Sequence, residues 1–96
     1  MAKLYRSDTA QDTALKRAAT IRSLIDGFER TIRILDIDIT TEEERVRIFD
    51  RSDAAYPVLA RTLAARRNNQ IITVADLTKR LSAITATISA EVPQAA

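Results

Sequence analysis

The stretch LAARRNNQ, residues 63–70, carries the side chains best suited to contact a nucleic acid. Arg66 and Arg67 could bind phosphates, and the two amides that follow them could read base edges. With two further cations of the same half, the candidate nucleic-acid contacts are Arg61, Arg66, Arg67 and Lys79. The alternative is a polar layer inside a helix pair, which fixes register at some cost in stability. The pattern favours this alternative, because Arg67 and Gln70 fall on the apolar repeat described below.

The stretch TTEEERVRI, residues 40–48, contains three consecutive carboxylates. A metal site needs several oxygen ligands that converge on one point. On a helix, three consecutive side chains point in three different directions. We therefore expect a solvated surface here and no metal-ligating residues.

Catalytic residues are not recognisable in this chain. Ser52 and Asp53 stand together, but the chain has no His and no Cys, and no Lys lies near enough in the sequence to activate the hydroxyl. A single Gly excludes a glycine-rich phosphate loop. The sequence therefore predicts neither an enzyme nor a protein that binds a cofactor.

The charge is unevenly distributed along the chain, whose formal net charge is +2. Residues 8–49 carry more acidic than basic side chains, whereas residues 57–90 carry five basic side chains against Asp76. These opposite signs favour pairing of the two halves with each other over binding to a polyanion. A net charge this small does not by itself indicate a nucleic-acid partner.

The expected location of the protein is the cytoplasm. No apolar run approaches the roughly 18 residues that a membrane-spanning helix needs, so we expect no membrane association. The first residues, MAKLYRSDTAQD, lack the apolar segment of a secretory signal. Twelve Arg against three Lys, together with abundant Ala, is typical of a GC-rich bacterial genome.

The elements that must carry these groups are helices. One Gly and two Pro leave few tight turns, which argues against an all-β fold. In both halves apolar residues recur at alternating spacings of four and three, which is the heptad pattern of a coiled coil. We call this set of positions the seam. In the first half it comprises Ala14, Ala18, Ile21, Ile25, Phe28, Ile32, Leu35, Ile39, Glu42, Val46 and Phe49. In the second half it comprises Tyr56, Ala60, Leu63, Arg67, Gln70, Val74, Leu77, Leu81, Ile84 and Ile88.

The residues FDRSDAAYP, 49–57, interrupt this pattern and predict a turn. Asp and Ser are turn and N-cap residues, and Pro57 is tolerated in the first turn of a helix but not in its interior. The sequence thus predicts an all-α fold, a single coiled-coil-like antiparallel helical hairpin. Its expected parts are a helix over 8–49 capped at Ser7 or Asp8, a turn over 50–56, a helix over 57–89 and a frayed tail over 90–96.

The first helix could instead be broken within Asp36–Thr41. Thr40 with Glu43, and Thr41 with Glu44, resemble capping boxes, and the β-branched residues here weaken a helix. The seam nevertheless crosses this stretch without losing phase. This favours a continuous helix that has at most a local kink. The sequence leaves both possibilities open.

The seam also predicts a register for the two helices. Pairing residues whose numbers add to 109 places Glu42, the one acidic seam residue, opposite Arg67, the one basic seam residue. The same register pairs the large Phe49 with the small Ala60. We therefore predict Glu42 and Arg67 as a polar pair within the seam.

A second group of apolar residues lies off the seam. In the predicted register Ile37 is level with Ile72, and such a surface usually marks an interface. The predicted dimer interface comprises Ile34, Ile37, Ile48, Val58, Ile71 and Ile72. The sequence thus predicts a small protein–protein interaction module, a scaffold, adaptor or regulatory accessory that acts by coiled-coil association. Its expected partner is a second copy, forming a four-helix bundle, or another helical protein; the alternative is a nucleic-acid-binding regulator.

Overall fold

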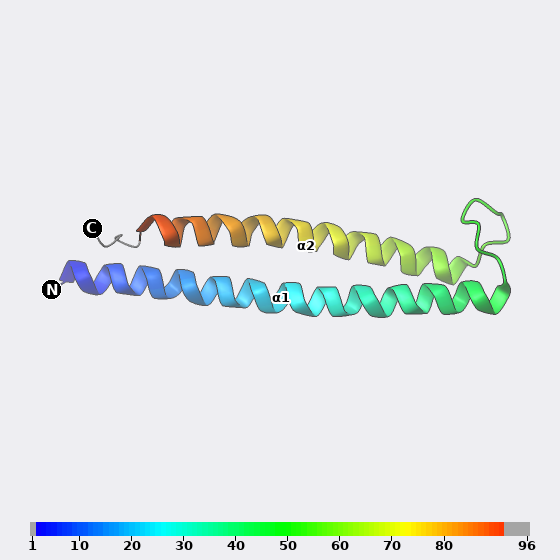
Figure 1. Cartoon of the computed structure of the whole chain (residues 1–96), viewed down its shortest axis with the longest axis horizontal. Helices are drawn as coiled ribbons and strands as arrows, with labels where there is room; N and C mark the ends of the chain where they lie inside the picture. The colour runs from blue at the N-terminus through cyan, green and yellow to red at the C-terminus, as the bar shows by residue number, and fades with distance from the viewer. Residues whose placement is uncertain (1, 92–96) are drawn as a thin grey trace. The chain divides into compact units, whose positions relative to one another are not determined.

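Two helices make up the described part of the chain, in the order α1 (Ala2–Val46) and α2 (Val58–Glu91) (Figure 1). The computed structural model describes the backbone of residues 2–91 and the side chains of residues 9–90. No strand occurs within residues 2–91, so the predicted all-α class is confirmed. The predicted fraying of residues 92–96 lies outside the described residues, whereas residues 90 and 91 are still helical.

Helix α1 is continuous through Asp36–Thr41, which is the possibility that the seam favoured. Within this stretch the Thr41 hydroxyl donates to the carbonyl of Ile37 at 2.8 Å, so the polar side chain bonds within the helix and does not break it. Ile39 is buried, and packing of this kind outweighs the weak helix propensity of β-branched residues. The predicted start at residue 8 is wrong, since α1 already includes residues 2–7.

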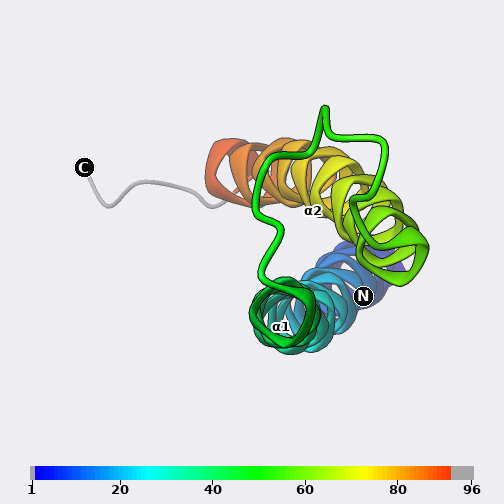
Figure 2. The same ribbon diagram turned by 90° about the vertical axis from the view of Figure 1, so that its right-hand side faces the viewer.

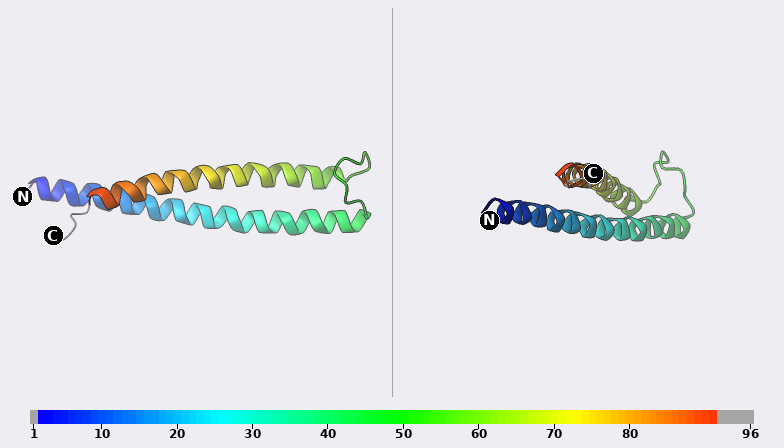
Figure 3. Two further views of the ribbon diagram at one scale, coloured as in Figure 1. Left: turned by 45° about the horizontal axis from the view of Figure 1, so that its top comes forward. Right: turned by 60° about the vertical axis from the view of Figure 1, so that its left-hand side comes forward.

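The helices form two compact units. Unit 1 comprises residues 1–26 and 75–96, of which 2–26 and 75–91 are described, and unit 2 comprises residues 27–74. Within each unit a segment of α1 packs beside a segment of α2 that runs in the opposite direction (Figures 1 and 3). This arrangement confirms the predicted antiparallel hairpin of two helices.

The predicted seam is the buried surface of both units. Ala18 and Ile21 are buried in unit 1, and Leu35, Ile39 and Ala60 are buried in unit 2. Among the described side chains, every seam residue except Phe49 is buried or half-buried. Full burial of a Leu or Ile side chain contributes about 1.5–3 kcal/mol, so burial of the seam is the main contribution to the stability of each helix pair.

The register in unit 2 differs from the predicted one by one heptad. Ala60 lies in a buried cluster with Ile39, whereas the predicted register placed it opposite Phe49, which is 56% exposed. Arg67 is bonded to Asp36. These contacts fit pairs whose residue numbers add to about 102 instead of 109. A shift of seven still places seam residues against seam residues, so the heptad pattern could not distinguish the two registers.

The observed register is accompanied by an earlier end of α1 than predicted. Arg47 adopts a left-handed conformation with a φ of 61°, and its N–H donates to the carbonyl of Glu43 at 2.8 Å. This is the αL termination of a helix, a position that usually holds Gly. The helix therefore ends at Val46 and not at the predicted Phe49, which leaves Phe49 in the loop.

The loop of residues 47–57 crosses from the end of α1 to the start of α2 (Figure 2). Asp50 Oδ1 accepts hydrogen bonds from the N–H and the hydroxyl of Ser52 at 2.9 and 2.7 Å. Asp53 Oδ1 accepts one from the N–H of Ala55 at 2.8 Å. These side-chain oxygens accept hydrogen bonds from loop N–H groups that have no helical partner. The predicted turn is therefore present, and it extends beyond residues 50–56.

Candidate interaction surfaces

A polar contact joins the two helices of unit 2. Arg67 Nη1 on α2 donates to Asp36 Oδ1 on α1 at 2.8 Å, and the Arg67 side chain is only 20% exposed. The predicted pair of Glu42 with Arg67 is wrong, because the one-heptad shift brings Asp36 to Arg67. Glu42 instead pairs on its own helix with Arg45.

Glu42 and Arg45 form a two-pronged ion pair. Arg45 Nη2 lies 2.6 Å from Glu42 Oε1, and Arg45 Nε donates to Glu42 Oε2 at 3.1 Å. The hydrogen bond from Arg45 lowers the pKa of the Glu42 carboxyl and in turn raises the pKa of Arg45. A planar guanidinium matches a carboxylate in this way, so the Glu42 carboxylate is paired within its own helix.

Two polar atoms of the seam in unit 2 lack a partner. Arg67 Nε and Gln70 Oε1 are both buried, and neither has a hydrogen-bond partner in the described part of the chain. A buried polar atom left unpaired costs about 1–3 kcal/mol. The polar layer expected from the sequence is therefore present, and it is incompletely satisfied in this register.

Tyr56 is a buried aromatic residue of the loop. Its hydroxyl donates to Glu43 Oε2 at 2.8 Å, and the Arg61 guanidinium carbon lies 5.3 Å from the centre of its ring. Arg61 Nη2 also donates to the carbonyl of Asp53 at 3.0 Å. Burial raises the pKa of Tyr56, and the hydrogen bond to Glu43 raises it further. The sequence placed Tyr56 on the seam but gave no sign of its bond to Glu43, which depends on the observed register.

The four candidate nucleic-acid contacts do not act as one free cationic group. Arg61 and Arg67 are engaged by the loop and by Asp36, as described above. Arg66 is exposed on unit 2, and Lys79 is exposed on unit 1. Two of the four predicted phosphate contacts are therefore already bound within the protein.

Five of the six predicted interface residues are exposed. They are Ile34 (57%), Ile37 (64%), Val58 (77%), Ile71 (46%) and Ile72 (65%). The sixth, Ile48, is half-buried against the cluster of Ile39, Tyr56 and Ala60, so less of its side chain is available to a partner. Its position in the loop, where it folds back on this cluster, follows from the early end of α1.

The exposed apolar side chains are concentrated in unit 2. Among the described side chains nine large hydrophobic residues are exposed, and seven of these belong to unit 2. We call Ile34 and Ile37 the α1 patch and Ile71 and Ile72 the α2 patch. The remaining three, Phe49, Val58 and Leu59, lie in the loop or at the start of α2. Phe49 and Leu59, together with Leu15 and Leu24 of unit 1, were not recognised as exposed from the sequence.

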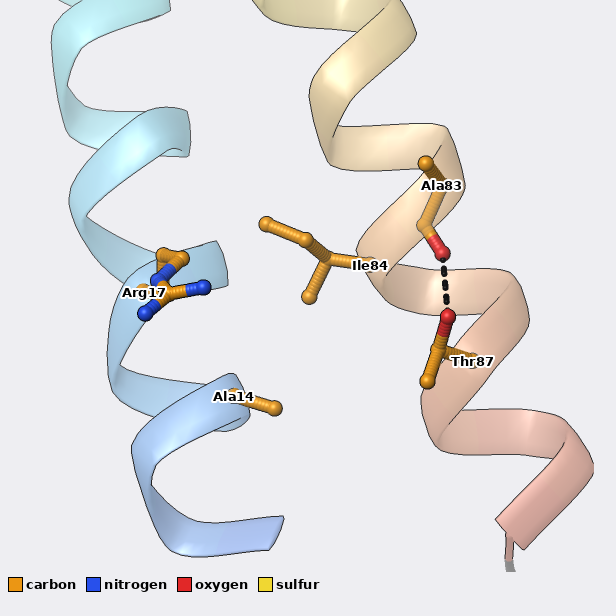
Figure 4. Close-up of a pocket in the computed structure, with 5 residues that line it drawn as sticks. All are labelled: Ala14, Arg17, Ala83, Ile84 and Thr87. Atoms are coloured by element: carbon orange, nitrogen blue, oxygen red, sulfur yellow. Dashed lines mark hydrogen bonds between the residues drawn. The ribbon is translucent and has the colours of Figure 1, made fainter. Parts of the chain in front are cut away.

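Small hollows lie on each unit. In unit 1 a hollow of about 230 Å³ is lined by Ala14 and Arg17 of α1 and by Ala83, Ile84 and Thr87 of α2 (Figure 4). In unit 2 a groove of about 270 Å³ is lined by Asp36, Ile37, Thr40 and Thr41. Both are smaller than a usual ligand pocket and are suited to a single side chain of a partner. The groove adjoins the α1 patch through Ile37.

The described residues offer no metal-ligating cluster and no helix that is long and apolar enough to span a bilayer. Comparison of the chain with protein-family models, curated proteins and solved structures finds no match. A functional assignment must therefore come from the surfaces described above.

Proposed function

We propose that this protein is a small helical interaction module, a scaffold, adaptor or regulatory accessory, and that its first partner is a second copy of itself. The observation that carries this proposal is the concentration of exposed large apolar side chains on unit 2. Association of two hairpins through these side chains would give a four-helix bundle.

The energetic argument concerns the four Ile residues of the α1 patch and the α2 patch. They are 46–65% exposed although the seam beside them is buried. Burying an Ile side chain contributes about 1.5–3 kcal/mol relative to full exposure. Association costs several kcal/mol in lost translational and rotational freedom, so several patch residues must be buried together for a stable dimer.

The groove beside Ile37 supports a helical partner. Its floor combines an apolar side chain with the polar groups of Asp36, Thr40 and Thr41. An apolar centre bordered by polar groups is the usual composition of a protein–protein interface. A shallow groove of this size accommodates one side chain of a partner.

The observed register changes how the two patches relate to each other. The predicted register placed Ile37 level with Ile72, but in the observed register these residues are one heptad out of step. The α1 patch and the α2 patch are therefore offset along the hairpin and form separate surfaces. Substitution of one residue in each patch distinguishes their contributions.

Sedimentation velocity at micromolar concentration tests the proposal. We expect the wild type to sediment as a dimer, and we expect Ile37→Glu or Ile72→Glu to weaken association about tenfold or more, because a buried unpaired carboxylate is costly. Arg33→Glu and Asn69→Glu are controls at exposed positions outside the patches. Circular dichroism verifies that each variant stays helical. A monomeric wild type would exclude self-association.

Nucleic-acid binding has less support as a function, because Arg61 and Arg67 are already engaged within unit 2. A mobility shift with duplex DNA and with single-stranded RNA at rising salt separates the two functions, since phosphate contacts weaken steeply with salt. A salt-sensitive complex that Arg66→Ala weakens would favour this alternative.

A further inference from the structure

We infer that the hairpin has two stable registers one heptad apart, and that α2, which is one continuous helix, slips as a whole along α1 between them. The observed register pairs residues whose numbers add to about 102, and the second is the register that the sequence pattern predicted, with pairs that add to about 109. This inference is independent of the proposed self-association, because every contact involved lies within one chain.

Apolar packing does not oppose such a slip. In both registers seam positions of α1 meet seam positions of α2, because the two differ by one heptad. Leu63, which now packs against the cluster that contains Ile39, would instead lie opposite Val46. One aliphatic partner replaces another, so this layer remains apolar.

The acidic partners of Arg67 also repeat at the heptad spacing. Arg67 now binds Asp36, and Glu43 occupies the same heptad position one repeat later. After the slip, Arg67 lies beside Glu42 and Glu43 in the way that it now lies beside Leu35 and Asp36. Two carboxylates then supply enough acceptors for Arg67 Nε, which is buried and unpaired in the observed register.

The end of α1 supplies the length that the second register needs. Arg47 is a non-glycine residue in the left-handed region, with a φ of 61°, which is unfavourable for a residue with a Cβ atom. Continuing α1 to Phe49 returns Arg47 to helical geometry. The same change carries Phe49, now 56% exposed, to a seam position opposite Ala60.

Contacts of the loop favour the observed register. Tyr56 is 3% exposed, donates to Glu43 and packs with Ile48 against Ile39. The second register sacrifices these contacts and gains those of Phe49 and of Arg67 with its new carboxylates. The observed register thus has buried Tyr56, its bond to Glu43 and the pair of Arg67 with Asp36, whereas the second has Phe49 on the seam and Arg67 beside two carboxylates. Each register therefore has stabilising contacts that the other lacks.

Disulfide trapping in the full-length chain tests the inference, because the natural sequence has no Cys to interfere. Ile39→Cys with Leu63→Cys reports the observed register, and Val46→Cys with Leu63→Cys reports the second. Ile32→Cys with Leu63→Cys is the control. It corresponds to a register one heptad from the observed one in the opposite direction, so it cross-links only if the helices separate or unfold. The dilute protein is oxidised mildly, and mass spectrometry counts monomeric cross-linked product.

We expect both reporter pairs to cross-link well above the control. Asp36→Asn should raise the ratio of the second cross-link to the first by about twofold to fivefold. Glu42→Gln should lower it by a similar factor, since Glu42 contacts Arg67 only in the second register and pairs with Arg45 of its own helix in the observed one. Both substitutions keep an oxygen acceptor, so they change charge with little change in shape. Cross-linking of the first pair only, or equal cross-linking of all three pairs, would overturn the inference.

Discussion

Arg67 of α2 and Asp36 of α1 are 31 residues apart in the sequence, and Arg67 Nη1 lies 2.8 Å from Asp36 Oδ1. Among the described residues this is the ion pair that joins the two helices, since the other three lie within a single helix. It therefore identifies the register of unit 2. The consequences of that register can be measured in solution.

Asp36 and Arg67 should show stronger energetic coupling than Glu42 and Arg67. Asp36 is 50% exposed, so solvent screens the pair and the expected coupling is about 0.5–1 kcal/mol. Double-mutant cycles with Ala, followed by urea unfolding, measure both couplings. A larger coupling for the pair of Glu42 and Arg67 would mean that the second register predominates.

Gln70→Leu should stabilise the protein. Gln70 Oε1 is buried without a hydrogen-bond partner, and Leu removes that unpaired atom while keeping a similar volume. The expected gain is about 1–2 kcal/mol in the free energy of unfolding. Asn69→Leu, at the adjacent exposed position, is the control and should change stability by less than about 0.5 kcal/mol. Loss of stability in Gln70→Leu would show that a partner satisfies this amide in solution.

The heptad pattern predicted the helical hairpin and its buried surface, because the spacing of apolar residues determines which face of each helix is buried. Leu35, Ile39 and Ala60 are buried as that pattern requires. A shift of seven residues leaves the heptad pattern unchanged, so the pattern could not predict which layer of α2 meets which layer of α1. That choice depends on where α1 ends, and the ending uses Arg47 in a conformation that its residue type does not signal.

The exposure of residues on the candidate surfaces could also be predicted only in part from the sequence. Exposure of Ile34, Ile37, Ile71 and Ile72 follows from their positions off the seam. The exposure of Phe49 and the partial burial of Ile48 could not be predicted, because both follow from the geometry of the loop. Seam residues beside a helix end are therefore the ones for which periodicity is least informative.

Arg47→Gly should stabilise the observed register. Gly adopts a φ of 61° without steric cost, which more than offsets its greater flexibility in the unfolded chain, so we expect a gain of about 0.5–1 kcal/mol. Glu44→Gly, within the last turns of α1, should instead cost about 1 kcal/mol. Thermal unfolding monitored by circular dichroism measures both. Destabilisation by Arg47→Gly would indicate that α1 continues past Val46 in solution.

Alkaline pH should destabilise the protein through Tyr56. Its pKa is raised in the folded state, chiefly by burial and then by the hydrogen bond to Glu43, so folding favours the protonated phenol. The stabilisation is fully present below the unfolded pKa of about 10 and is lost as pH rises through the higher folded value. Urea unfolding across this range should therefore show a decline that Tyr56→Phe removes, and tyrosinate absorbance should show one phenol that ionises late. Two phenols that ionise together near the unfolded value would contradict burial of Tyr56 and the register that depends on it.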